Sequence, residues 1–406
     1  MANNCTILFL LRGYNDIDHI APIIWKASQN DLVCYYYFVD KDYSDDYRIE
    51  FVRRSGAKMI YSPPLNSYHK HLRHKIPFHG LRRIVDRLVA NLIGTRILIT
   101  YKINSVVSEW AGPYGREMAE YFLRPAKLLR IPSFSVPHGY HYWTNLVVNE
   151  TVKSYVDKHD QLPSFENRKI YTAYVVQTQN IRQYYLAHGM PKTTLYVLGS
   201  ARFSNEWQSI NFGICPHSEV KTGQSWRLTI LFFIPDWSYF IDREATITLL
   251  SRIAQLPNVQ LLIKQNTRGT GQLTHSEEDE LKSINRNCLI VGDNYHSPDL
   301  IDQSDCIINF ASSIGIEAIL QDKIVCNPRY LTSNSTIFDD SGVVTDTLGL
   351  SETIDFLSSL IIGKHNQLDS EKIQNFLIEH VYAGSIDSDV LDNYVNVIAG
   401  NLNSTE

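Results

Sequence analysis

The stretch "DCIINFASSIGIEAIL", residues 305–320, contains two kinds of local pattern in direct succession. Its first apolar run is typical of a buried β-strand, and the apolar residues of "SSIGIEAIL" recur at helical spacing. Ser312, Ser313 and Gly315 stand at the junction, and Glu317 follows one turn later. A strand that runs through a small polar turn into a helix is the building unit of parallel sheets, so this stretch predicts an α/β fold.

The same alternation continues outward to both ends of the chain. Strands are expected at 5–11, 32–40, 96–101, 131–136, 173–179, 195–199, 227–236, 259–265 and 288–292, with helical patterns between them. The pattern lapses at about 204–226, where Gly, Pro, Ser and His occur without periodicity. We therefore expect an N-terminal domain over 1–207, a linker over 208–226, a C-terminal domain over 227–385, and a helix over 386–406 that can return to the first domain.

Composition limits the class of protein. A chain of 406 residues predicts more than one domain, and its net charge of −5 gives no general reason to expect nucleic-acid binding. The six cysteines are scattered without a C-x-x-C pair, which favours reduced thiols over disulfides or a zinc site. No apolar run approaches the ~18 residues of a membrane-spanning helix. We expect a cytoplasmic protein that reaches a membrane only at its surface, on the inner face of the cytoplasmic membrane.

Polar residues follow the strands expected in the second half. The first turn of a helix attracts phosphate, so Ser312 and Ser313 are candidate phosphate donors. Gly315 would let a ligand approach the backbone, and Glu317 would accept from a sugar hydroxyl such as that of a ribose. An ordinary serine N-cap on an amphipathic helix is the alternative.

Three further loops of this half carry candidates. Lys264 and Gln265 end the strand "LLIKQ", Asp236 follows "LFFIP", and Tyr295 and His296 lie in the loop after "CLIVG". A lysine at a strand end can meet a phosphate, a carboxylate there can act as acid, base or nucleophile, and an aromatic ring can stack on a nucleobase. A solvated charge, a turn aspartate and an incidental polar loop are the corresponding structural alternatives.

The first half offers a second set of candidates. "LRGYNDIDHI" places Arg12, Gly13, Asp18 and His19 in the first strand-to-helix loop, and His138 follows a strand in "SVPHG". An arginine beside a glycine suits an anionic ligand, and a histidine can transfer protons near neutral pH. Asp18, like Asp16, can equally be a helix N-cap. No G-x-G-x-x-G, P-loop or H-E-x-x-H motif occurs, which counts against dinucleotide, P-loop and zinc-protease chemistry, and we assign no metal ligands.

A basic patch over residues 69–87 contrasts with the acidic chain. It favours contact with an anionic membrane or a charged glycan, and a solvated basic face is the alternative.

Several of these motifs together resemble a known family. "PHG", "LYVLGSARFSNEW" (195–207), "KQN" and "SSIGIEA" are similar to motifs of GT-B glycosyltransferases, in particular the retaining β-Kdo transferase modules of bacterial O-antigen and capsule polysaccharide synthesis. The resemblance implies two Rossmann-like domains whose parallel sheets face a central cleft. It also implies CMP-β-Kdo as the donor on the second domain, a glycan acceptor that can be lipid-linked on the first, and no metal or other cofactor.

The resemblance also assigns roles to the candidates. Asp236 corresponds to the nucleophile that forms a glycosyl-enzyme, and in an inverting enzyme His138 or Asp18 would be the base. The donor would be held by Ser312, Ser313, Gly315, Glu317, Lys264, Gln265, Tyr295 and His296, and Arg12, Gly13 and His19 would lie on the acceptor side. The alternatives are a CDP-glycerol glycerophosphotransferase, a CMP-sialic acid transferase, or a non-catalytic nucleotide- or glycan-binding module.

Overall fold

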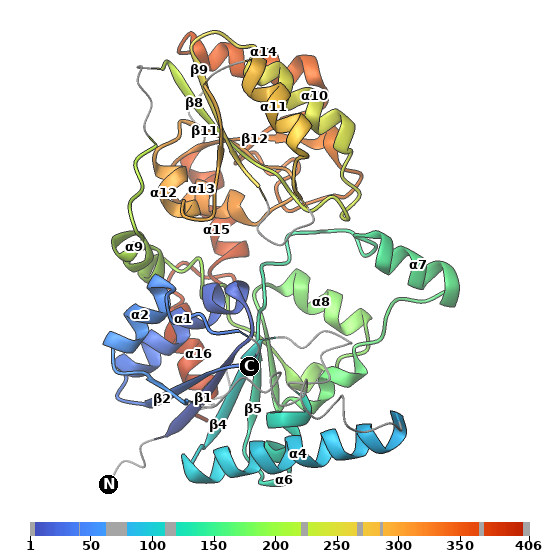
Figure 1. The fold of residues 1–406 in the computed structure, drawn as a ribbon, viewed down its shortest axis with the longest axis vertical. Helices are drawn as coiled ribbons and strands as arrows, with labels where there is room; N and C mark the ends of the chain where they lie inside the picture. The colour runs from blue at the N-terminus through green and yellow to red at the C-terminus, as the bar shows by residue number, and fades with distance from the viewer. Residues whose placement is uncertain are drawn as a thin grey trace. The chain divides into compact units, whose positions relative to one another are not determined.

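The computed structural model describes residues 5–39, 41–61, 79–109, 119–220, 226–265, 271–284, 287–364 and 369–400. The chain packs into two compact units, drawn in Figure 1. Unit 1 comprises Met1–Tyr140, Ser164–Ile214 and Leu377–Glu406, and unit 2 comprises His141–Pro163 and Cys215–Phe376.

Unit 1 is built on a seven-stranded parallel sheet in the order β3-β2-β1-β4-β5-β6-β7. Its strands are β1 (Thr6–Leu11), β2 (Val33–Phe38), β3 (Lys58–Met59), β4 (Ser105–Glu109), β5 (Ser133–Val136), β6 (Ala173–Val176) and β7 (Leu195–Val197). The chain moves outward from β1 to β3 and restarts at β4 on the other side of β1, which is the order of a doubly wound Rossmann-like sheet. This order creates a switch point between β1 and β4, beyond whose carboxyl ends ligands bind in such sheets.

Helices cover both faces of this sheet. They are α1 (Tyr14–Gln29), α2 (Tyr47–Arg54), α4 (His79–Thr100), a π-helix (Ala119–Leu123), α6 (Arg124–Leu128), α8 (Gln179–Ala187), α9 (Asn205–Ile214) and α16 (Val390–Ile398), with short 3₁₀ turns at Glu166–Ile170 and Lys192–Thr194. Figure 1 shows α1, α2 and α16 grouped apart from α4 and α6. All six side chains of β1 are buried, because a central parallel strand is covered on both faces and so reads as a continuous apolar run.

Unit 2 repeats the same order with a six-stranded parallel sheet, β10-β9-β8-β11-β12-β13. Its strands are β8 (Leu228–Phe233), β9 (Val259–Lys264), β10 (Cys288–Val291), β11 (Cys306–Ile308), β12 (Ile324–Pro328) and β13 (Thr345–Thr347). Its helices are α7 (Glu150–His159), α10 (Arg243–Ala254), α11 (His275–Ile284), α12 (Ser297–Asp302), α13 (Ile314–Leu320) and α14 (Leu350–Ile361), with a 3₁₀ turn at Arg329–Leu331. α15 (Ser370–His380) begins in unit 2 and ends in unit 1. The predicted fold class, two Rossmann-like α/β domains with parallel sheets, is confirmed.

The boundaries within the chain differ from the expected ones in the first half. Residues 141–163 pack with unit 2, although the sequence pattern assigned them to the N-terminal domain. The reason is Trp143, which is 7 % exposed within the unit 2 core, pairs as a β-bridge with Thr336 and stacks on Tyr239 at 5.5 Å between ring centroids. Because these contacts connect residues far apart in the sequence, local periodicity carries no sign of them.

The expected linker and C-terminal boundary also differ. Residues 205–214, which overlap the expected linker, form helix α9. The return to unit 1 begins at Leu377 rather than at 386, because the carbonyl of Val381 accepts from the Ser200 backbone N–H at 2.8 Å. Gly199 has φ of +83°, and a Cβ there would lie 2.4 Å from the same carbonyl, so glycine is required at this turn.

The apolar run "RILITY", expected as a strand, lies at the end of α4, and the strand that pairs with β1 is the next segment, Ser105–Glu109. Ile97 and Leu98 of this run face the unit 1 core. Such a short apolar run is compatible either with a buried strand or with the buried face of a helix. The basic patch over 69–87 lies largely outside the residues whose side chains the structure describes. Among the helices of the described chain, none combines the length and apolar character needed to cross a bilayer.

Candidate active site

Four polar side chains of unit 1 come together at its switch point, and we call them the acid–base cluster: Arg12, Asp16, Glu109 and His138. Arg12 directly follows β1, Asp16 lies in the first turn of α1, Glu109 ends β4, and His138 follows β5. These strands are neighbours in the sheet, so their carboxyl ends bring together residues that are far apart in the sequence.

The histidine of the acid–base cluster contacts two buried carboxylates. His138 Nδ1 lies 3.0 Å from Asp16 Oδ1 and 3.2 Å from Glu109 Oε2. Both carboxylate side chains are fully buried, whereas the His138 side chain is 28 % exposed. An ionised carboxylate only accepts hydrogen bonds, so these contacts assign the ring hydrogen to Nδ1 and leave the lone pair of the neutral ring on Nε2.

The backbone explains why Asp16 occupies its place. Its Oδ2 accepts from the backbone N–H of Arg12 at 2.7 Å and of Gly13 at 3.2 Å, which are donors at the start of α1. The positive end of the helix dipole favours a carboxylate at this position. Asp16 therefore satisfies the helix start with one oxygen and holds His138 with the other.

The charges of the acid–base cluster do not cancel while His138 is neutral. Arg12 Nη2 lies 2.6 Å from Glu109 Oε1, and this pair neutralises one of the two carboxylates. The remaining carboxylate leaves a local charge of about −1, which a proton arriving on His138 would balance. The arrangement is thus suited to take up a proton from a substrate hydroxyl and to release it later.

Three side chains of the acid–base cluster are also of types that can bind a metal ion. Within the described residues, Asp16, Glu109 and His138 are the group of His, Cys, Asp and Glu side chains whose ligand atoms lie close together, within 4.8 Å of one another. A cation bound there would lie beside the Arg12 guanidinium, which already occupies a Glu109 oxygen. This donor set therefore fits proton transfer better than metal binding.

Two candidates that the sequence places after β1, Asp18 and His19, lie outside the acid–base cluster. Asp18 pairs with Arg48, and its Oδ2 lies 3.4 Å from Arg202 Nη1. His19 is 2 % exposed inside α1. Arg12 and Gly13 connect to His138 through Asp16 and Glu109. Asp18 lies in a separate ion-pair network.

In unit 2 the turn between β11 and α13 contains Ser312 and Ser313, both partly exposed. The Ser312 hydroxyl accepts from the Ile314 backbone N–H at 3.3 Å, and its carbonyl accepts from Asn309 Nδ2 at 3.0 Å. Asn309 is 1 % exposed, and its Oδ1 has no hydrogen-bond partner among the described residues. A buried amide oxygen without a partner is one sign of a missing polar ligand.

Gly315 has a packing role that differs from the predicted one. A Cβ at this position would lie 2.6 Å from Asn309 Nδ2 and 2.8 Å from Phe338 Cζ. The glycine is buried, so its missing side chain makes room for the protein's own groups and not for a ligand approaching from solvent. Glu317 is 1 % exposed in the same helix, so the carboxylate expected to meet a sugar hydroxyl is inside unit 2.

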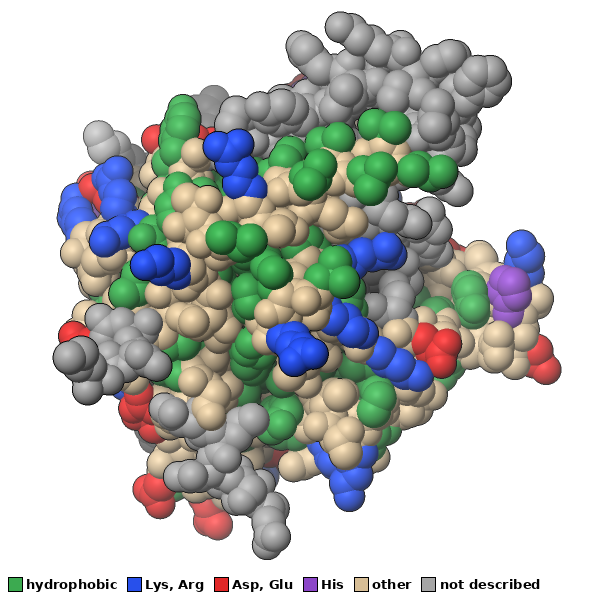
Figure 2. Space-filling model, turned by 90° about the horizontal axis from the view of Figure 1, so that it is seen from below, with side chains coloured by type: hydrophobic (Ala, Val, Ile, Leu, Met, Phe, Trp, Pro, Cys, Tyr) green, Lys and Arg blue, Asp and Glu red, His purple; other side chains and the backbone are tan. Residues whose placement is uncertain are grey.

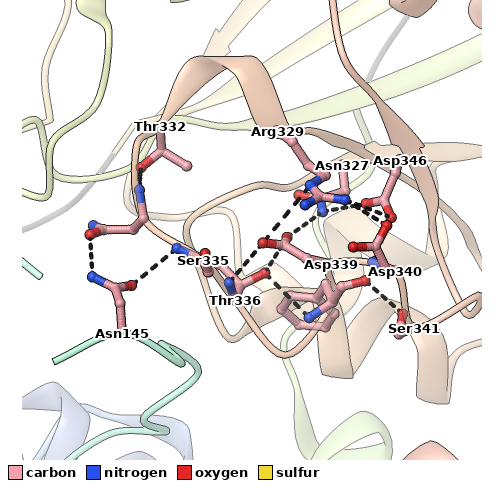
Figure 3. Close-up of polar contacts among 12 residues, drawn as sticks. Asn145, Asn327, Arg329, Thr332, Ser335, Thr336, Asp339, Asp340, Ser341 and Asp346 are labelled. Carbon is pink, nitrogen blue, oxygen red and sulfur yellow. Dashed lines mark hydrogen bonds and ion pairs between the residues drawn. The ribbon is translucent and has the colours of Figure 1, made fainter.

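Phe338 belongs to a loop that a polar network fixes (Figure 3). Asn327 Nδ2 donates to Asp339 Oδ1 at 3.1 Å and to Asp346 Oδ1 at 2.7 Å. Asp339 Oδ2 in turn accepts from the Thr336 backbone N–H at 3.0 Å. The network holds the loop and therefore Phe338 against the start of α13.

The segment that joins unit 2 from the first half of the chain anchors the same loop. Figure 3 shows Asn145 beside Ser335, and the Ser335 backbone N–H donates to Asn145 Oδ1 at 3.0 Å. Asn145 Nδ2 donates to Asn334 Oδ1 at 2.9 Å. Asn145, which follows His138 by seven residues, thus helps to hold the loop that packs against the β11–α13 turn.

Lys264 and Gln265 are held by their own unit. Lys264 Nζ donates to the Gly292 carbonyl at 2.7 Å, and burial lowers the pKa of this lysine although Asp293 opposes the shift. Gln265 binds Glu278 Oε1 at 2.9 Å through Nε2 and accepts from the Leu273 backbone N–H at 2.7 Å. Lys264 thus joins β9 to the loop after β10, and Gln265 joins the end of β9 to α11 and the residue Leu273 before it.

The remaining donor-side candidates are more open. Tyr295 and His296 are partly exposed in the loop before α12, and His296 precedes the first residue of that helix. Asp236 is also partly exposed and accepts from the Ser238 backbone N–H at 2.9 Å, which makes it part of a turn after β8. β8 and β11 are neighbours at the switch point of unit 2, so Asp236 and Ser312 follow adjacent strands.

Sequence reasoning missed Glu109 and Asn309, and it left Asp16 as a helix cap. Glu109 was hidden because the strand was expected one segment too early. A glutamate at the end of "SVVSE" would have drawn attention once that segment was assigned as the strand. Asn309 ends the apolar run of β11 as an ordinary polar residue, and no local signal shows that it is buried.

Comparison with known proteins supports the fold at low sequence similarity. No family model matches the chain, and no curated protein matches it in sequence. Its structure is similar to that of UDP-GlcNAc 2-epimerase from Neisseria meningitidis bound to UDP-GlcNAc, with a TM-score of 0.58, 14 % identity, and coverage of 98 % of this chain and 100 % of that chain. A glycosyltransferase from Rickettsia africae gives a TM-score of 0.58, 12 % identity, and coverage of 99 % and 100 %. Another UDP-N-acetylglucosamine 2-epimerase gives 0.61, 10 % identity, and coverage of 100 % and 99 %. The chain therefore has the GT-B fold of these proteins.

Proposed function

We propose that this protein is a nucleotide-sugar-dependent glycosyltransferase in which His138 is the general base. The observation that carries the proposal is the contact of His138 Nδ1 with two fully buried carboxylates at the switch point of unit 1. An acceptor hydroxyl is a weak nucleophile until a base removes its proton. The GT-B fold, shared with an enzyme bound to UDP-GlcNAc and with a glycosyltransferase, supports a nucleotide sugar as the donor.

The finer proposal is that the donor is CMP-β-Kdo and that the reaction retains the anomeric configuration. It rests on the sequence resemblance to retaining β-Kdo transferase modules. The Asp236 carboxylate attacks the anomeric carbon and CMP leaves, which forms a glycosyl-enzyme. The acceptor oxygen, whose proton a general base removes, then attacks the same carbon and releases Asp236.

Unit 2 supplies the groups proposed for the donor. Ser312 and Ser313 are partly exposed at the turn after β11, and Asn309 Oδ1, for which the described residues provide no hydrogen-bond partner, lies under that turn. A monophosphate leaving group carries little charge, so hydroxyl and backbone donors are proposed to stabilise it without a metal ion. We also propose that Tyr295 and His296 contact the nucleobase of the donor.

Product analysis tests the proposal. The protein is incubated with CMP-Kdo and a panel of glycan acceptors, and in parallel with UDP-GlcNAc, CDP-glycerol and CMP-sialic acid. We expect an acceptor product and free CMP only with CMP-Kdo, an unchanged rate with EDTA, and loss of product in Asp236→Ala. Unchanged turnover in Asp236→Ala would reject the nucleophile.

Because several structural neighbours are epimerases, the same assay also tests for epimerase activity. Conversion of UDP-GlcNAc without any acceptor would replace the transferase proposal with an epimerase. Binding of CMP without turnover of any donor would favour a non-catalytic module.

A further inference from the structure

Helix α4 of unit 1 has apolar residues on two sides. Ile97 and Leu98 belong to the unit 1 core, and Ile93 packs against that core. Another set points outward and remains exposed: Ile84 by 56 %, Leu88 by 57 %, Leu92 by 71 % and Ile99 by 60 %. We call these four residues the α4 stripe.

The α4 stripe is a continuous line on the helix surface. Its members follow at steps of four, four and seven residues, so at 3.6 residues per turn they lie within an arc of about 80°. Of the core-facing residues, Ile93 and Ile97 lie on the other side of the helix, and Leu98 borders the stripe. Large side chains aligned in this way lower the free energy only when something apolar covers them.

Neighbouring segments extend this face. α4 packs closely on the following π-helix, since a Cβ at Gly94 would lie 1.6 Å from the Tyr121 carbonyl oxygen. At the end of α6, Leu128 is 76 % exposed and Leu129 is 38 % exposed. Figure 2 looks onto the side on which α4 and α6 lie in Figure 1, and it shows hydrophobic side chains interspersed with Lys and Arg.

The charge of this face is opposite to that of the chain. The exposed cations of α4, α6 and the residues that follow them include Arg96, Lys102, Lys127 and Arg130. Within the described part of the chain none of these four forms an ion pair. The protein carries a net charge of −5, and Figure 2 shows the acidic side chains mostly toward the edge of this view. The face therefore combines a solvent-exposed apolar stripe with unpaired positive charge.

We propose that the α4 stripe and its flanking cations dock unit 1 on the surface of an anionic lipid bilayer. Amphipathic helices with leucine or isoleucine on one face and Lys or Arg beside it lie in the headgroup region of such membranes. A second copy of this chain is disfavoured as the occupant, because a two-fold contact would bring the same cations together. The proposal does not depend on the reaction proposed above.

Vesicle co-sedimentation of the full chain tests the proposal. We expect binding to vesicles of phosphatidylglycerol and phosphatidylethanolamine at least about tenfold stronger than to phosphatidylcholine vesicles, and weaker at high salt. The double variant Leu88→Ser, Leu92→Ser should lose at least about tenfold of this binding. Arg96→Glu with Lys127→Glu should remove the preference for anionic lipid.

The matched control lies in unit 2, where Leu348 is 68 % exposed and Ile362 is 61 % exposed. Leu348→Ser with Ile362→Ser removes as much exposed apolar surface and should bind vesicles as the unchanged protein does. All variants should keep the melting temperature, because the changed side chains face solvent.

Three outcomes would overturn the proposal. The first is that the unchanged protein does not sediment with anionic vesicles. The second is that the stripe variant and the control bind equally. The third is that ultracentrifugation shows a dimer of the unchanged protein that only the stripe variant loses, which would make the face a contact between copies.

Discussion

Asp16 and Asp18 provide a paired test, because they lie on the same helix two residues apart but in different surroundings. Asp16 is fully buried in the acid–base cluster, and Asp18 is 24 % exposed and paired with Arg48 and Arg202. The substitutions Asp16→Asn and Asp18→Asn each replace a carboxylate with an amide of the same size. We expect a large loss of turnover in the first variant and a small one in the second.

The expected effect on stability follows from the contacts of Asp16. Two backbone N–H groups donate to its Oδ2, and hydrogen bonds to a charged acceptor are worth about 1 kcal/mol more than neutral ones. Loss of the charge at the start of α1 costs about a further 0.3–1 kcal/mol. Removal of a buried charge partly offsets these terms. We expect Asp16→Asn to lower the free energy of unfolding by about 1–3 kcal/mol.

The expected effect on turnover follows from the tautomer of His138. An amide at position 16 can present N–H to Nδ1, and it then favours the ring with its hydrogen on Nε2, where the proton of the acceptor has to go. Loss of a positioned general base costs about 10²–10⁴-fold. Glu109 remains within 3.2 Å and retains part of the original preference, so the lower end of this range applies.

Urea denaturation and turnover of the accepted donor measure the two effects separately. Asp18→Asn should keep turnover within about threefold, since a partly exposed ion pair contributes little. Wild-type turnover in Asp16→Asn, or an equal loss in Asp18→Asn, would refute the assignment of the acid–base cluster.

Three further predictions concern packing and titration. Gly315→Ala places a methyl group against Phe338 and should lower the free energy of unfolding by about 1–3 kcal/mol in urea denaturation, and an unchanged midpoint would contradict this packing. Burial lowers the pKa of His188, so the unfolded chain binds more protons, and stability should fall as pH drops below about 6.5, by at most about 1.4 kcal/mol per pH unit. His188→Gln should reduce that dependence in a pH series of denaturation curves. If the free energy of unfolding varied with pH as steeply in the variant as in the unchanged protein, His188 would not be its cause. Burial raises the pKa of Cys34 to about 11 and of Cys326 to about 12, so a thiol reagent at neutral pH should label them only after unfolding, and rapid labelling of the native protein would show that they are accessible.

The sequence predicted the α/β class because the strands that decide it are largely buried. β1 and β8 read as apolar runs bounded by turn residues, and such runs need no tertiary information to be recognised. The prediction was wrong at residues 96–101, where the apolar run is compatible with either a strand or a helix. Ile97 and Leu98 pack on the core from the end of a helix, so the expectation of a strand there displaced β4 and concealed Glu109.

The site was predictable only one loop at a time. Arg12 and His138 were selected because each follows an apparent strand, but their common neighbours were not visible. Asp16 looked like a helix cap, and it is one, through the same carboxylate whose other oxygen contacts His138. Only the strand order of the sheet brings the ends of β1, β4 and β5 together.

In unit 2, burial altered the predicted roles. Glu317 and Gly315 were selected from their spacing along a helix, and both are buried in the structure. The helical period fixes which residues share a face, but it does not show which face the sheet covers. Ser312 and Ser313, in the turn itself, stay partly exposed.

His138→Asn is the sharpest test of His138 as the general base. Turnover of each nucleotide-sugar donor is measured for the unchanged protein and the variant, with the rise in melting temperature on adding CMP as the check that the nucleotide still binds. We expect at least about a hundredfold slower turnover with the CMP-induced rise preserved. Turnover at the unchanged rate in His138→Asn would contradict this role.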